Sequence, residues 1–228
     1  MVFSIRFQFI IILFFLATTS HAQQFYRIKA DYSIKQKQHD GTQSLTMGTV
    51  YYDKNFKKIV YKNKFPNTET WITIDTTLYK IIDDKIISKS KVPAIAELTI
   101  FHIALSGQLS NYGFDKSSYK ISNVEKQNDL VITTWLPPQK FSKLLGKILI
   151  STKDKRLFGI IFYNPQNEIS SKQFFEDFQN FNGFDFPSKI VQINYVNNKE
   201  DYQVITYKNI LTNQTNESNM YNFVLPVK

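Results

Sequence analysis

The feature that most constrains the fold is a strict alternation of apolar and polar residues near the start of the chain. Tyr26, Ile28, Ala30, Tyr32 and Ile34 alternate with charged or polar residues at every second position. A repeat of two places the apolar side chains on one face of an extended strand. Further short strands are predicted between turns rich in Asp, Asn and Pro, at 45–52, 57–64, 70–74, 77–81, 85–88, 119–124, 130–136, 147–151, 157–163, 169–178, 186–196 and 202–211.

The connections between these segments are short, as at 152–155 and 197–200, and such lengths are typical of hairpins. Parallel neighbours would need repeated crossover helices, and the pattern shows only one helical segment. We therefore expect a mainly β (α+β) fold in which a single curled antiparallel sheet of about a dozen strands, in sequential order, forms a full or incomplete β-barrel.

The helical segment covers 93–109, where apolar residues recur at spacings of three and four. Pro93 suits the first helical turn, and Gly107 is a candidate end point. Ile100 and Ile103 add apolar side chains to the other side, so the helix must be covered on more than one face. Two interpretations remain equal: a helix buried in an ordinary α+β core, or a helix that lids the concave side of the sheet beside space for an apolar ligand.

The first 22 residues resemble a cleaved signal peptide, which predicts one domain at 23–228. Arg6 precedes an 11-residue apolar run that is too short to span a bilayer, and 20–22 offer the small residues that signal peptidase reads. No cysteine follows, so neither acylation nor a disulfide is expected. We expect a soluble protein that is exported to the periplasm.

The whole chain carries a formal charge of +9, and loss of Arg6 leaves +8. This balance favours anionic lipid surfaces over nucleic acid as partners of an exported protein. Most lysines are scattered between apolar residues, a pattern more typical of solvated strand faces than of a dedicated binding stripe.

Residues suited to catalysis are scarce. After the signal, only His39 and His102 remain, and His102 lies in the apolar helix, where a structural role is favoured. No Gly-x-Ser-x-Gly motif and no phosphate-binding glycine loop is present. Adjacent carboxylates such as Asp83 and Asp84 point to opposite faces of a strand. We expect no enzyme, no metal and no cofactor, and instead an apolar cavity that binds an acyl chain.

Several segments together resemble the LolA-type periplasmic carriers of outer-membrane lipoproteins, in particular Bacteroidetes-type members. Within 48–81 the order is two strands, Phe65-Pro66, Trp71, Asp75 and an aromatic strand. The hairpin at 157–163 and the ending at 216–226 are also similar to that family. The resemblance covers most of 23–228 in order and length.

The resemblance implies an unclosed β-barrel whose helices lid an apolar cavity for the acyl groups of a lipoprotein. It also implies transient contacts with an inner-membrane transporter and an outer-membrane acceptor. We expect the protein to be a monomer and to bind no nucleic acid. The chain departs from the family twice: a strand starts at Tyr26 with no preceding amphipathic helix, and Asp53-Lys54-Asn55 replaces the Arg-Pro whose Arg helps to hold the lid shut.

Strand phase and the helix predict which side chains line the cavity. The alternative function is a non-enzymatic periplasmic sensor or envelope-assembly interaction module on the same fold, with the sheet filled by its own side chains. The predicted lipid-binding residues are Met47, Trp71, Leu98, Phe101, Leu105, Trp135, Phe158 and Ile160.

Overall fold

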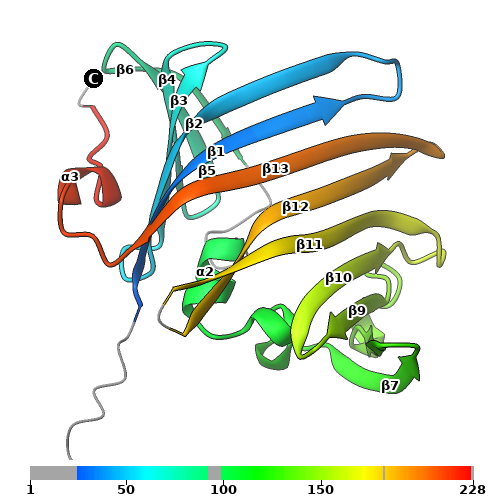
Figure 1. The fold of residues 1–228 in the computed structure, drawn as a ribbon. Helices are drawn as coiled ribbons and strands as arrows, with labels where there is room; N and C mark the ends of the chain where they lie inside the picture. The colour runs from blue at the N-terminus through cyan, green and yellow to red at the C-terminus, as the bar shows by residue number, and fades with distance from the viewer. Residues whose placement is uncertain (1–24, 92–98, 182, 227–228) are drawn as a thin grey trace, which may run out of the picture.

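The computed structural model describes residues 25–91, 99–181 and 183–226. The alternating segments form one antiparallel sheet of 13 strands (Figure 1). The strands are β1 (Arg27–Lys37), β2 (Gln43–Asp53), β3 (Lys58–Phe65), β4 (Glu69–Ile74), β5 (Thr77–Ile82), β6 (Lys85–Lys91), β7 (Lys120–Gln127), β8 (Leu130–Leu136), β9 (Ile148–Lys153), β10 (Arg156–Tyr163), β11 (Ile169–Phe181), β12 (Phe184–Val196) and β13 (Lys199–Thr212).

The strand order is β6-β5-β4-β3-β2-β1-β13-β12-β11-β10-β9-β8-β7. Successive strands pair as expected, except that β6 and β7 do not pair with each other. The sequence pattern did not indicate this exception. The first and last strands are neighbours, with Tyr32 opposite Tyr207, so the break in the sheet falls between β6 and β7. The segment with the predicted helix connects these two edge strands.

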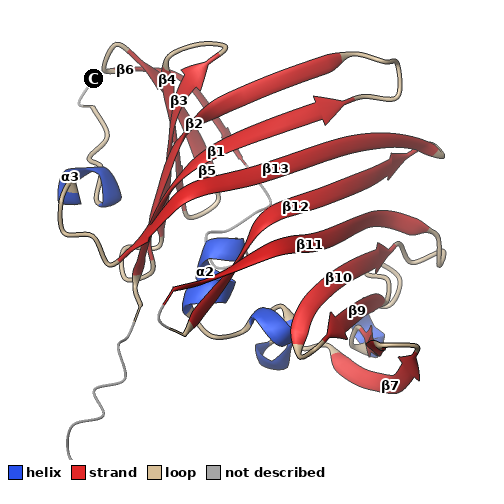
Figure 2. Cartoon of the chain, in the orientation of Figure 1, coloured by secondary structure: helices blue, strands red, loops and turns tan. Residues whose placement is uncertain are grey.

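The sheet curls around α2 (Ile100–Leu105) without closing, as Figures 1 and 2 show. This confirms the predicted incomplete barrel with an apolar helix on its concave side. Along β1, Ile28, Ala30 and Tyr32 are buried and belong to the cluster around α2, and we call this concave side the inner face. A smaller cluster on the other side, the outer face, contains Tyr51 and Val60.

The described part of the predicted helix is shorter than the expected 93–109. The Thr99 hydroxyl accepts a bond from the His102 N–H at the start of α2, and five of its six residues are buried. The helix ends at Leu105 because Ser106 has a non-helical backbone and Gly107 lies at φ +67°, a conformation that favours glycine. Residues 93–98 lie outside the described residues. Two short 3₁₀ turns follow, Leu109–Asn111 and Phe114–Lys116, labelled η2 and η3.

A short helix near the C-terminus, α3 (Ser218–Tyr221), covers the outer face of β2 and β3. The sequence pattern did not predict a helix there. Tyr221 is fully buried, and its ring meets that of Tyr51 edge-on, with centroids 5.5 Å apart. Arg27 forms an ion pair with the buried Asp53 and places its guanidinium 4.8 Å from the centre of the Tyr221 ring. The C-terminal segment is thereby fixed to the beginning of β1.

Of the helices in the described ranges, none has the length and apolar character that crossing a membrane requires.

Candidate functional site

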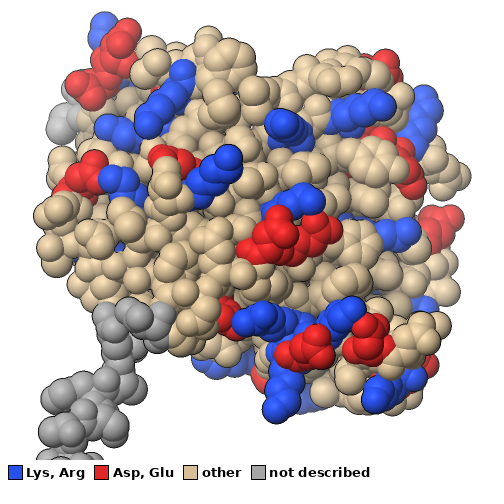
Figure 3. Space-filling model, viewed as in Figure 1, with Lys and Arg blue, Asp and Glu red and all other residues tan. Residues whose placement is uncertain are grey.

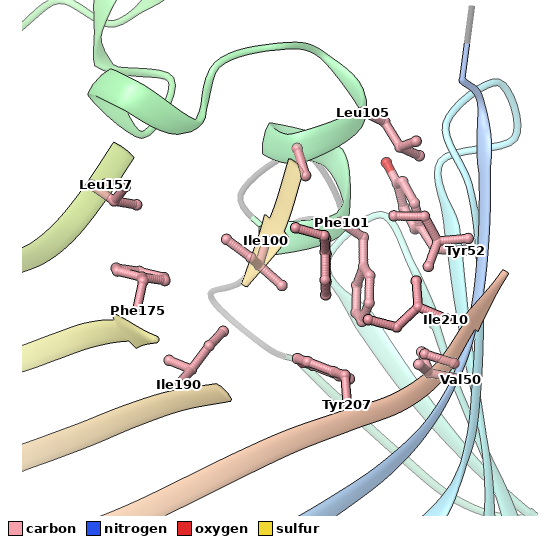
Figure 4. Close-up of a cluster of buried hydrophobic side chains, with 14 of the residues drawn as sticks. Val50, Tyr52, Ile100, Phe101, Leu105, Leu157, Phe175, Ile190, Tyr207 and Ile210 are labelled. Atoms are coloured by element: carbon pink, nitrogen blue, oxygen red, sulfur yellow. The ribbon is translucent and has the colours of Figure 1, made fainter. Parts of the chain in front are cut away.

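Helix α2 fills one end of the inner face with aromatic packing (Figure 4). Phe101 is 1% exposed, and its ring centroid lies 5.3 Å from that of Tyr207, 5.6 Å from that of Phe186 and 6.0 Å from that of Tyr52. The Lys54 ammonium donates to the Leu105 carbonyl oxygen at 3.3 Å, which places the end of α2 beside the β2–β3 turn. We call this the α2 end of the sheet; the opposite strand ends, near residues 37, 163 and 196, form the far end.

The histidine of α2 has a structural partner. The ring nitrogen Nδ1 of His102 lies 2.7 Å from the Tyr52 hydroxyl oxygen. His39, in the β1–β2 turn, lies 3.0 Å from the Asp201 carboxylate. Across the described residues, no group of three or more His, Cys, Asp or Glu side chains could hold a metal ion.

The 3₁₀ turns extend the aromatic packing over β8–β11. Tyr112 contacts Phe175 with ring centroids 5.8 Å apart, and Phe114 contacts Trp135 at 5.9 Å. Burial raises the pKa of Tyr112 to about 12, and burial also raises the pKa of Tyr207 well above its usual value. These phenols therefore stay neutral at any physiological pH, so they add no charge to the inner face.

Beyond α2, the strand register aligns an apolar row across four strands of the inner face. Ile34 on β1 lies opposite Ile205 on β13, which lies opposite Ile190 on β12, which in turn lies opposite Phe175 on β11. Ile190 and Phe175 are buried, whereas Ile34 and Ile205 are only half-buried. Apolar surface on the inner face therefore stays accessible where α2 does not reach.

Two residues farther towards the far end, the same register produces a row of four glutamines. Gln36 lies opposite Gln203, Gln203 opposite Gln192, and Gln192 opposite Gln173. The Tyr112 hydroxyl donates to Gln173 at 3.4 Å. A pocket of about 130 Å³ adjoins this row at the rim of the far end, where its lining includes the amides of Gln36 and Gln203 and the charged groups of Lys37 and Asp201. The inner face thus changes from aromatic, through aliphatic, to uncharged amide groups along the strands.

The predicted lipid-binding residues separate into four groups. Phe101, Leu105, Trp135 and Ile160 come together in the buried cluster of the inner face. Trp71 lies on the inner face of β4, opposite Tyr61, and the Lys80 ammonium lies 4.6 Å from its ring centre. Among the described residues, the indole N–H groups of Trp71 and Trp135 have no acceptor. Leu98 lies outside the described residues.

Met47 and Phe158 lie on the outer face instead, for two different reasons. In β2, unbroken alternation from the inward-facing Val50 places Gly48 inward, opposite Tyr32, and Met47 outward, opposite Ser33, so the phase predicted for Met47 was wrong. Phe158 is the extra residue between Leu157 and Gly159, so its ring turns outward against Phe174. Simple alternation does not reveal such insertions. Met47 lines an outer pocket of about 340 Å³, together with Lys64 and Lys208.

Sequence analysis missed the glutamine row and Ile34, Ile190 and Ile205. Their apolar or amide character was visible, but their alignment depends on strand register, and in particular on the pairing of the first and last strands. The alternating pattern indicated that Ile34 faces inward, and this was the available signal.

Comparisons with known proteins place the fold. No protein-family model and no curated protein matches the sequence. A LolA superfamily protein from Nitrosomonas europaea has a similar structure, with a TM-score of 0.58 at 12% identity, over 87% of this chain and 91% of that one. A putative outer membrane lipoprotein-sorting protein domain from Vibrio parahaemolyticus gives a TM-score of 0.61 at 11% identity, over 89% and 92% of the two chains.

A DUF1329 family protein from Desulfovibrio piger is also similar, with a TM-score of 0.59 at 8% identity, over 87% of this chain and 90% of that one. At such low identities the likeness is one of fold. The chain has a LolA-like fold, as its sequence had indicated.

Proposed function

We propose that this protein is an exported, periplasmic carrier that binds the acyl chains of lipoproteins, or of another lipid, on its inner face and moves them towards the outer membrane. The observation that carries the proposal is the graded inner face: apolar side chains near α2 and a row of glutamines two residues beyond them. An acylated molecule has the same gradation, from hydrocarbon to an uncharged polar linkage. The fold shared with a lipoprotein-sorting domain supports this reading.

Each part of the inner face has a role in the proposed complex. Ile34 and Ile205 contact the acyl chain, and Gln203 and Gln192 donate to and accept from the ester or amide groups that follow it. Each buried methylene contributes about 0.8 kcal/mol, so a 16-carbon chain supplies on the order of 10 kcal/mol before the entropic cost of binding. No covalent chemistry is required, so the proposed activity is binding and release.

The proposed route has a donor and an acceptor. In this scheme an inner-membrane transporter loads the inner face and an outer-membrane acceptor empties it. The protein acts as a monomer between them and needs neither cofactor nor metal. The predicted signal peptide at 1–22, removed before residue 23, supplies the export step.

A second candidate function, a sensor or envelope-assembly interaction module, is favoured by one specific observation. Phe101, Phe186 and Tyr207 already pack together on the inner face near the α2 end, beside a hollow of about 640 Å³ at that end. If this packing continued over the whole inner face, no acyl chain would fit. The half-buried state of Ile34 and Ile205 favours the carrier.

The decisive experiment measures how well palmitate displaces an environment-sensitive apolar dye from the protein. Native mass spectrometry of the protein purified from the periplasm of the producing cells then shows whether an acylated molecule co-purifies. The test variant Ile34→Gln/Ile205→Gln places amides in the apolar row, and we expect at least a tenfold loss of palmitate affinity. The control Val191→Gln/Val204→Gln alters a directly opposed pair on the outer face. Failure of the native protein to take up dye or palmitate, with no co-purified acyl molecule, would favour the interaction module.

A further inference from the structure

The connection between β8 and β9, residues 137–147, exposes apolar side chains that the fold leaves uncovered. Leu144 is 74% exposed, Leu145 41% and Phe141 38%, and Leu136 just before them is 44% exposed. Exposed leucines and phenylalanines concentrated in a single loop are unusual at a water-facing surface.

The backbone of this loop forms hydrogen bonds within the loop and packs against β10. The Phe141 N–H donates to the Pro138 carbonyl oxygen at 2.8 Å, and the Leu145 N–H donates to the Phe141 carbonyl oxygen at 2.8 Å. Gly146 packs so closely against β10 that a Cβ there would lie 2.0 Å from the Tyr163 carbonyl oxygen. The loop needs little further ordering before it contacts a partner.

Lysines alternate with the apolar residues of the same loop. Lys140, Lys143 and Lys147 lie within it, and the sequence contains no acidic residue from 130 to 152. The Lys140 ammonium lies 4.9 Å from the centre of the Phe141 ring, so positive charge and apolar surface are adjacent. Among the ion pairs found between described residues, none involves these three lysines.

We propose that residues 137–147 are a membrane-contact site for a bilayer surface rich in anionic lipid. Phe141, Leu144 and Leu145 enter the acyl boundary, and the three lysines contact phosphate groups at the level of the headgroups. Lysine stems commonly span this boundary, with the methylenes in the apolar layer and the ammonium in water. Charge complementarity selects a lipid surface over an apolar protein groove.

The position of the loop fits such a contact. Ile148 pairs with Trp135 and with Phe162, so the loop lies at the far end of the strands, opposite the α2 end. The glutamine row lies towards this same end. A bilayer bound by the loop therefore meets the protein at the end that α2 does not fill. This inference does not depend on carrier function, because an interaction module could also use the surface.

The test is flotation of the purified protein with vesicles of phosphatidylglycerol and phosphatidylethanolamine, compared with vesicles of phosphatidylcholine alone. We expect binding to the anionic vesicles that weakens with added salt. Each lysine near such a surface contributes a factor of about five in affinity, so Lys140→Gln/Lys143→Gln is expected to bind about 25-fold more weakly. The control Lys126→Gln/Lys155→Gln removes equal charge near the α2 end.

The apolar part is tested by Leu144→Ser/Leu145→Ser, which should abolish flotation, while Phe56→Ser, in the β2–β3 turn at the other end, should not. Leu144→Trp should show blue-shifted emission with vesicles and quenching by brominated lipid, and Phe56→Trp should show neither. Equal binding to both vesicle types, or equal loss in loop and control variants, would overturn the proposal, as would the absence of binding. Loss of palmitate binding with intact flotation would instead contradict only the proposed carrier function.

Discussion

Phe101 of α2 and Tyr207 of β13 meet edge to face, with ring centroids 5.3 Å apart and an interplanar angle of 73°. This contact joins α2 to β13, which pairs with β1 in the middle of the sheet. The helix on the inner face is thereby packed against the central strands. Both side chains are almost fully buried. The geometry is one that aromatic pairs prefer.

Replacement of Phe101 by Ala should therefore destabilise the fold strongly. Truncation of a buried phenylalanine leaves a cavity and typically costs about 3–5 kcal/mol. The free energy of unfolding, measured by urea titration, checks this value. Phe56→Ala, at a side chain that is 44% exposed, is the matched control and should change stability by less than about 0.5 kcal/mol. Similar losses in both variants would contradict the assignment of Phe101 to the core.

Removal of Arg27 should also be costly, because it leaves a buried carboxylate without its ion-pair partner. Asp53 is 1% exposed, and its oxygen Oδ1 accepts from the Asn55 N–H at 2.7 Å. Arg27→Ala is expected to cost about 3–5 kcal/mol in chemical unfolding, the usual range when one partner of a buried pair is lost.

The double variant Arg27→Met/Asp53→Asn removes both charges and serves as the control for this prediction. It should recover much of the loss, since the buried charge disappears with its partner. A double variant as unstable as Arg27→Ala would show instead that the contact of Arg27 with Tyr221, or another part of its packing, is the main contribution.

Stability should fall in acid partly through Glu217. The hydrogen bond from Lys29 lowers the pKa of Glu217, so the folded state favours its charged form. The corresponding stabilisation is present above the ordinary pKa of 4.5 and is lost as the pH falls below it, towards the lowered value in the folded protein. Glu217→Gln should flatten the dependence of the unfolding midpoint on pH between about 5 and 3. Glu125→Gln, an exposed carboxylate on β7, is the control; equal slopes in wild type and Glu217→Gln would refute the prediction.

Substitution of the glutamine row should change ligand preference. Gln192→Leu/Gln203→Leu extends the apolar row by one step, since the two positions are directly opposed. We expect tighter binding of a plain hydrocarbon dye and weaker binding of an acyl ester relative to that dye, because the amides that pair with the linkage are gone. Competition between the dye and a monoacylglycerol measures the ratio. An unchanged ratio would argue against the glutamines as partners of the polar linkage.

Alternation in the sequence was sufficient to predict most strands and the antiparallel sheet, and the resemblance to LolA-type carriers indicated that the sheet would not close. Alternation failed at Phe158 because an extra residue is inserted into β10, and it failed at Met47 because the phase of β2 had been assigned wrongly; both side chains lie on the outer face. Gly48 shows what the pattern lacks: a Cβ there would lie 2.1 Å from the Lys62 carbonyl oxygen, a consequence of local pairing. Short helix α3 was also missed, because four residues give too little periodicity.

The glutamine row could not be predicted for a different reason. Gln36, Gln173, Gln192 and Gln203 are far apart in the sequence, and only the register of four strands aligns them. By contrast, the mixture of lysine and leucine at 137–147 is visible in the sequence, although sequence analysis did not single it out and its close packing against β10 is seen only in the structure.

The pairing of β1 with β13 has a kinetic consequence. The Asn213 side-chain oxygen accepts a hydrogen bond from the Tyr26 N–H, 187 positions away in the sequence. The strands next to these residues, β13 and β1, lie in the middle of the sheet, so segments near the two ends of the described chain meet there. Contacts of such separation close slowly, because a long loop must lose its freedom first. During synthesis, β1 can pair with β2 early, but its other edge waits until nearly the whole polypeptide has emerged. A chain shortened before β13 would leave that edge of β1, which carries the apolar side chains of Ile28, Ala30 and Tyr32, open to association with other copies.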